Sequence, residues 1–100
     1  ALADAGADFI VLECIPADLA RDVTEAIGIA TIGIGAGHET DAQVLVAHDL
    51  LGLSERPARF VKNFLTPENI YRDNPIKDAF SSFDKSVKAG TYPAAEHQYN

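Results

Sequence analysis

The sequence predicts an α/β protein in which parallel strands alternate with helices. Two short apolar runs, Phe9–Glu13 and Thr31–Gly35, are continuous rather than alternating, which is typical of strands buried on both faces of a parallel sheet. A segment with helical spacing separates them, and this strand–helix–strand order is the pattern of a βαβ unit. The chain has 100 residues, 47% hydrophobic and 23% charged, so we expect at most one small folded domain.

The segment between the two runs predicts a helix that begins near Pro16 and is capped by Gly28. Its apolar residues recur with helical spacing: Leu19, Ala20, Val23, Ala26 and Ile27. Residues 1–6 resemble the last turn of an earlier helix ended by Gly6, and the chain contains no Met. We therefore expect this chain to be a fragment of a longer protein.

The middle of the chain is harder to interpret. Thr40 and Gln43 have the spacing of a capping box, which predicts a short helix from about residue 41 and a short third strand near residues 46–50. Prolines punctuate residues 53–74, which we expect to be mostly connection, with one or two helical turns over Arg59–Phe64.

A final helix is predicted after Asn74 and Pro75, which suit an N-cap and a first helical turn. Gly90 suits its C-cap. Its apolar residues form one helical stripe: Ile76, Ala79, Phe80, Phe83 and Val87. Residues 91–100 show no periodicity and are expected to form an irregular tail.

Charge excludes several function classes. The net charge is −7, with −8 in residues 1–50 and +1 in residues 51–100, which argues against a nucleic-acid partner or an anionic membrane surface. No apolar run reaches the roughly 18–20 residues of a membrane span, and no signal peptide is apparent. The single cysteine, Cys14, excludes an internal disulfide and fits a reducing compartment.

Glu13 is the main candidate for chemistry. It ends a buried strand just before a helix, and in α/β folds the carboxyl ends of parallel strands face the ligand crevice. A carboxylate there is partly desolvated and can serve as a general base. The alternative is a structural role, in which Glu13 caps the following helix or pairs with a lysine.

Gly33, Gly35 and Gly37 form a second candidate at the end of the next strand. Glycine leaves room where a ligand or a neighbouring backbone approaches closely. The spacing lacks the third glycine of a dinucleotide fingerprint and the Lys and Ser/Thr of a P-loop. A cradle for phosphate or carboxylate and a tight turn packed under a neighbouring loop remain equal alternatives.

The remaining polar candidates favour structural roles. We expect Cys14 to be buried and inert. His38, His48 and His97 share no metal-ligand spacing with one another or with Cys14. A basic cluster at Arg56, Arg59 and Lys62 is expected to be a solvated face, although it could contact an anionic substrate.

Three blocks carry a family resemblance: Phe9–Pro16, Ile32–Gly37, and Thr40–Asp41 with Gln43–Asp49. Two shorter stretches support them: Lys62–Phe64, and Gly90–Pro93 with Glu96–His97. Together they resemble ketopantoate hydroxymethyltransferase over nearly the whole chain. The resemblance implies the C-terminal part, the last three βα units, of a (β/α)8 TIM barrel of the phosphoenolpyruvate/pyruvate class. Residues 1–100 would then be one fragment of a single barrel domain, since a complete barrel needs roughly 250 residues.

The resemblance also implies a reaction. The family transfers a hydroxymethyl group from 5,10-methylenetetrahydrofolate to 3-methyl-2-oxobutanoate, giving 2-dehydropantoate for pantothenate synthesis and releasing tetrahydrofolate. Glu13 matches the glutamate that removes the C3 proton, and Gly33–Gly37 would lie beside the substrate. A Mg²⁺ ion binds the keto acid through residues from earlier strands, so no metal ligand is expected here. The family is cytoplasmic and forms large homo-oligomers, and the fragment alone is expected to be inactive.

Three stretches depart from the family pattern, at Ala42, at Leu53–Pro57 and around Asn69–Asn74. They put folate contacts and oligomer surfaces in doubt more than the base. Two alternatives stay open: another barrel enzyme that binds a phosphorylated substrate at Gly33–Gly37, and a non-catalytic remnant that serves as an interaction piece.

Overall fold

A computed structural model describes all 100 residues and contains a three-stranded parallel sheet in the order β1-β2-β3. Strand β1 (Phe9–Glu13) is followed by α1 (Ala17–Ala26) and by β2 (Ala30–Ile34), as the apolar runs predict. Phe9 is opposite Ala30 and Glu13 is opposite Ile34, so β1 and β2 pair along their whole length. The parallel α/β prediction is therefore confirmed for this part of the chain.

The second half of the chain differs from the prediction. The third strand, β3 (Ala42–Gln43), comes first and the short helix α2 (Ala47–Leu50) follows it, which reverses the predicted order. The side chain of Gln43 donates to the hydroxyl of Thr40 (2.9 Å) and to the carbonyl of Gly37 (2.8 Å). These two polar side chains therefore bond each other, but they brace a turn that enters β3 rather than cap a helix.

The connection from β2 to β3 explains this reversal. Only residues 35–41 separate the two strands, whereas parallel strands usually need a crossover of a dozen residues or more, most often a helix. The crossover instead lies directly on β2, because a Cβ at Gly33 would be 2.6 Å from Oγ1 of Thr40. Because Gly33 has no side chain, the short connection can pack against β2 without a crossover helix.

Helix α3 (Pro75–Ala89) confirms the last predicted helix, with Pro75 in its first turn and Gly90 as a left-handed C-cap (φ 76°). The tail is irregular apart from the 3₁₀ turn η1 (Ala95–His97).

Three smaller predictions are wrong. Residues 59–64 contain no helix, α1 ends in an extended residue at Ile27 without using Gly28 as a cap, and Cys14 is exposed rather than buried.

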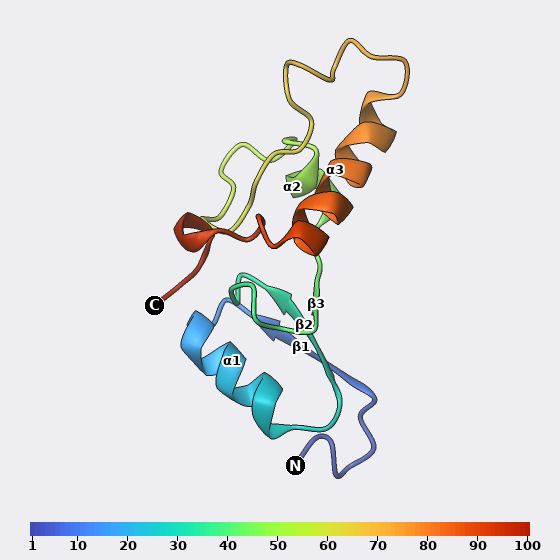
Figure 1. Cartoon of the computed structure of the whole chain (residues 1–100). Coiled ribbons are helices and arrows are strands. Elements are labelled where there is room, and N and C mark those ends of the chain that lie inside the picture. The colour runs from blue at the N-terminus through green and yellow to red at the C-terminus, as the bar shows by residue number, and fades with distance from the viewer.

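Figure 1 shows that the molecule is elongated, with the sheet and α1 at one end and α2 and α3 at the other. Its principal dimensions are 48 × 25 × 24 Å. A small apolar cluster under α1 (Leu12, Ala20 and Ala36) joins that helix to the sheet. None of the helices is long and apolar enough to cross a membrane.

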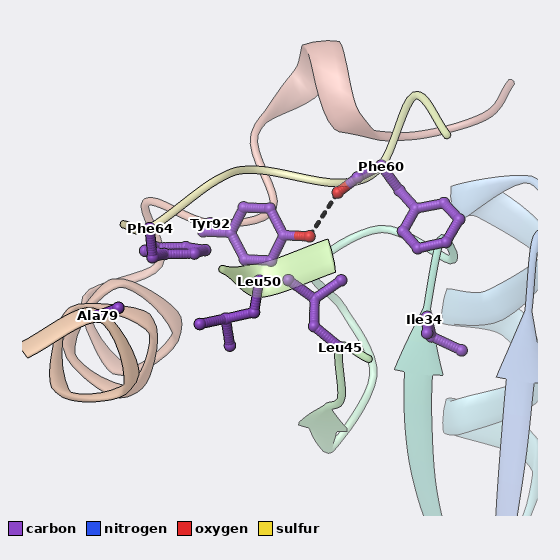
Figure 2. Packing of buried hydrophobic residues seen from close by; sticks show 7 residues of the cluster. All are labelled: Ile34, Leu45, Leu50, Phe60, Phe64, Ala79 and Tyr92. Carbon is purple, nitrogen blue, oxygen red and sulfur yellow. Dashed lines mark hydrogen bonds between the residues drawn. The ribbon is translucent and has the colours of Figure 1, made fainter. Parts of the chain in front are cut away.

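A larger aromatic cluster holds the other end together and reaches the sheet (Figure 2). Its buried members are Ile34, Leu45, Leu50, Phe60, Phe64, Ala79 and Tyr92. Phe64 packs edge-on against Tyr92 and Phe83 with ring centroids 5.5 and 5.6 Å apart. Phe60 and Phe64 stay in irregular backbone because their rings enter this cluster.

One sheet face and part of one helix stay uncovered. Phe9 and Val11 are 66% and 56% exposed, and Ile76 and Phe80 of the α3 stripe are 55% and 43% exposed. Only 16 of the 100 residues are buried. The chain therefore has more apolar surface on its sheet and on α3 than its own 100 residues bury.

Candidate active site

Glu13 is the last residue of β1 and its Cα is opposite Ile34 at the carboxyl end of β2. Alternate residues of a strand point to opposite faces. Leu12 and Ile10 belong to the cluster under α1, so Glu13 shares the other face with Phe9 and Val11. The predicted position at the strand end is correct. Glu13 is exposed, however, because none of the 100 residues covers that face.

The turn after Glu13 has an unusual backbone. Cys14 is the only residue other than glycine with a positive φ, at 52°, a left-handed conformation that side chains disfavour. Its amide donates to the carbonyl of Ile34 (2.9 Å), which extends the β1–β2 ladder by one bond. The chain then reaches α1 through Pro16. Nothing in the sequence marks this conformation, because glycine or asparagine usually occupies it.

The three candidate glycines are buried and surrounded by the chain itself. A Cβ at Gly35 would lie 2.8 Å from the ring of Phe60, and one at Gly37 would lie 2.7 Å from Cβ of Ala17. Gly33 meets Thr40 in the same way. The close approaches that the glycines permit are therefore contacts with neighbouring segments. Because Gly35 directly follows the partner of Glu13, this loop still borders the same edge of the sheet.

A family model described as ketopantoate hydroxymethyltransferase matches residues 1–95. The chain belongs to the ketopantoate hydroxymethyltransferase family. Each of the relatives reported below carries the name 3-methyl-2-oxobutanoate hydroxymethyltransferase.

The similarity to individual family members covers this chain almost completely. The chain is 52% identical to a relative from Psychrobacter sp. (strain PRwf-1) over 104 residues, which cover 100% of this chain and 38% of the relative. It is 52% identical to the relative from Saccharophagus degradans over 99% of this chain and 35% of that protein. It is 49% identical to the relative from Pseudomonas fluorescens (strain SBW25) over 100% of this chain and 36% of that protein. The chain thus spans a little over a third of the length of these relatives.

A polar network around the buried Thr31 supports the crossover of this family member. The side chain of Asp41 accepts hydrogen bonds from the amide (2.8 Å) and the hydroxyl (3.3 Å) of Thr31. The amide of Asp41 donates back to the Thr31 hydroxyl (3.1 Å), and the hydroxyl of Thr24 on α1 lies 2.9 Å from the same oxygen. Thr31 is fully buried. The signal of this network in the sequence is Thr31 itself, because a Thr within an apolar strand indicates a buried hydrogen bond.

The histidines and basic residues do not converge on Glu13. Nε2 of His38 lies 3.9 Å from Oε1 of Glu39, and His48 is exposed on α2. Nδ1 of His97 accepts a hydrogen bond from the amide of Ala94 (3.0 Å). The predicted basic cluster is solvated: Arg56, Arg59 and Lys62 are all exposed. No group of three or more His, Cys, Asp or Glu side chains is placed to hold a metal ion.

One shallow, open pocket lies beside the start of α1. It is lined by Ala17, Asp18, Arg21, His38, Glu39 and Gln98. The guanidinium of Arg21 is hydrogen-bonded to Asp22 and lies near Asp18, which raises the pKa of Arg21 above its ordinary value. The pocket is thus lined by charges that already pair with each other.

Proposed function

We propose that the full-length protein transfers a hydroxymethyl group from 5,10-methylenetetrahydrofolate to 3-methyl-2-oxobutanoate in the cytoplasm, with Glu13 as the general base. The observation that carries the proposal is the position of Glu13. It ends a parallel strand, on the sheet face away from α1, in a chain that belongs to this transferase family.

The architecture proposed for the whole protein is a (β/α)8 barrel, of which this chain is the C-terminal part with the last three βα units. The parallel sheet with α1 on one face supports it, because barrel strands carry helices outside and pack side chains inside. The uncovered face with Phe9 and Val11 would then turn toward the barrel interior. The greater length of the relatives leaves room for the remaining strands.

In the proposed reaction, the Glu13 carboxylate accepts the proton from C3 of the keto acid. The C–H electron pair becomes an enolate, whose carbon forms a bond to the bridging methylene carbon as one of its two C–N bonds to tetrahydrofolate breaks. Water then displaces the second nitrogen and supplies the hydroxyl group, and the protons released from C3 and from water end on the two nitrogens of tetrahydrofolate. In the barrel interior, Glu13 would lie next to Val11 on the same strand face, an apolar side chain that helps to keep water away from the carboxylate. Gly33–Gly37 would border the substrate beside it.

Metal binding is proposed for the rest of the protein only. The Mg²⁺ ion that the resemblance implies does not fit the residues of this chain, which contain no suitable cluster of ligands. No step is therefore assigned to the ion here. The folate contacts and the large homo-oligomer of the family are likewise proposed for the full-length protein and not for this chain alone.

The test is product formation by the full-length protein with the two substrates. We expect 2-dehydropantoate to form, and Glu13→Gln to lower kcat by about 10²–10⁴-fold, the usual contribution of a positioned base. Glu25→Gln is the matched control, because Glu25 is an exposed glutamate on α1. Absence of product with the unmodified enzyme, or equal activity of both variants, would contradict the proposal.

A further inference from the structure

The C-terminal tail contacts the turn that follows Glu13. The carbonyl of Tyr99 accepts a hydrogen bond (2.9 Å) from the amide of Ala17, the first residue of α1, and Tyr99 forms an isolated parallel bridge with Pro16. No side chain caps α1 at its N-terminus, and the tail satisfies one of the first four helical amides, which have no partner within the helix. Figure 1 shows the tail running from the 3₁₀ turn toward the start of α1.

Tyr99 is also anchored on its other side. Its side chain is half-buried and packs against the aromatic cluster, and the guanidinium carbon of Arg59 lies 5.8 Å from the centre of its ring. Tyr99 therefore links the end of the molecule that contains the aromatic cluster to the end that carries Glu13.

The turn that the tail contacts needs support. Cys14 adopts a left-handed conformation (φ 52°), and such conformations persist in side-chain-bearing residues only when the surroundings hold them. On one side the amide of Cys14 is bonded to the carbonyl of Ile34, and on the other side the start of α1 is bonded to Tyr99. Glu13 lies directly before this turn, so relaxation of Cys14 would redirect its carboxylate.

We propose that Tyr99 is a positioning residue for Glu13, acting through the Glu13–Ala17 turn. The proposal rests on the proposed function, which makes Glu13 the base. A base must lie within hydrogen-bond reach of the proton that it removes, and a displacement of about 1 Å can cost up to about 100-fold in rate. The tail thus contributes to catalysis by fixing the direction of a carboxylate.

The test uses the full-length enzyme. Tyr99→Ala removes the ring, and we expect kcat for exchange of the C3 proton to fall about tenfold while KM for the keto acid stays within twofold. Tyr99→Phe keeps the ring and should retain activity within twofold. Tyr71→Ala makes the same change at a tyrosine that is 93% exposed and should have no effect. Wild-type kcat in Tyr99→Ala, or a loss confined to KM, would overturn the proposal.

Arg59→Gln provides a second test if Tyr99→Ala does not fold. It removes the cation above the ring without opening the cluster, and we expect kcat to fall about threefold with KM unchanged. A raised KM at unchanged kcat would instead indicate contact between Arg59 and the substrate and would overturn the proposal.

Amide hydrogen exchange of the peptide that spans residues 13–17 separates this proposal from the role of Glu13. Exchange should be faster in Tyr99→Ala and unchanged in Tyr71→Ala, whatever the role of Glu13. Unchanged exchange in Tyr99→Ala would refute the inference that Tyr99 stabilises the Glu13–Ala17 turn. Faster exchange with wild-type kcat would refute positioning and leave Glu13 as base. Wild-type proton exchange in Glu13→Gln would instead refute the role of Glu13.

Discussion

Gly35 lies directly against the ring of Phe60, so that a Cβ on the glycine would be 2.8 Å from Cδ2 of the ring. This contact joins the carboxyl end of β2 to the aromatic cluster, because Phe60 is a buried member of that cluster. Gly35 directly follows Ile34, the strand partner of Glu13, and thus forms part of the junction between the two ends of the molecule.

Gly35→Ala should destabilise the full-length protein by about 2–4 kcal/mol, since it combines a left-handed alanine (φ 67° at this position) with overpacking against a buried ring. Gly28→Ala is the control, because Gly28 has an ordinary φ and no atom within 4 Å of an added Cβ. Its effect should be within about 1 kcal/mol. Urea unfolding checks both values, and equal stabilities of the two variants would contradict the contact.

Asp41→Ala should cost about 1–3 kcal/mol, because it removes the carboxylate that accepts from the amide of buried Thr31 and that lies 3.3 Å from its hydroxyl. Asp22→Ala removes a carboxylate that pairs with Arg21 at the surface and should cost less than about 1 kcal/mol. The comparison is made by chemical denaturation at neutral pH. A larger loss for Asp22→Ala would show that the crossover does not depend on Asp41.

The pH dependence of stability should report on Tyr92. Burial raises the pKa of Tyr92 to about 12, above the value of about 10 in an unfolded chain. Between these two pH values the unfolded state loses the phenol proton first, so the unfolding free energy falls as pH rises. The stabilisation is complete below pH 10, and about 2 kcal/mol of it is lost by pH 12.

Tyr92→Phe isolates this effect from the other groups that titrate at high pH. The variant lacks the hydroxyl that donates to the carbonyl of Phe60 (Figure 2) and should be less stable by about 1 kcal/mol at pH 8. Denaturation curves at pH 8 to 12 should show the difference from wild type shrinking toward high pH and then reversing. A constant difference would mean that Tyr92 titrates normally.

Much of the fold could be predicted from the sequence wherever local pattern and tertiary packing agree. The continuous apolar runs predicted β1 and β2, and the Asn74–Pro75 start and Gly90 end predicted α3. The segment from residue 40 to 51 could not be predicted, since its strand exists only because a short crossover lies on Gly33. The helical turns predicted over Arg59–Phe64 are absent for a similar reason: Phe60 and Phe64 pack into a cluster whose other members lie far away in the sequence.

The candidate site was predicted in part. An apolar run that ends in a carboxylate was enough to place Glu13 at a strand end. Its exposure could not be predicted, because it depends on what covers the sheet face away from α1 rather than on residues nearby in the sequence. The left-handed Cys14 and the contact of Ala17 with Tyr99 were also missed. They arise from backbone bonds that carry no side-chain signature.

The most direct test of the central claim is exchange of the C3 proton of 3-methyl-2-oxobutanoate with deuterated water, followed by NMR on the full-length enzyme without the folate donor. This measurement isolates proton removal from one-carbon transfer. We expect Glu13→Gln to slow the exchange by about 10²–10⁴-fold while Glu25→Gln exchanges like wild type. Exchange at the wild-type rate in Glu13→Gln would show that another group removes the proton.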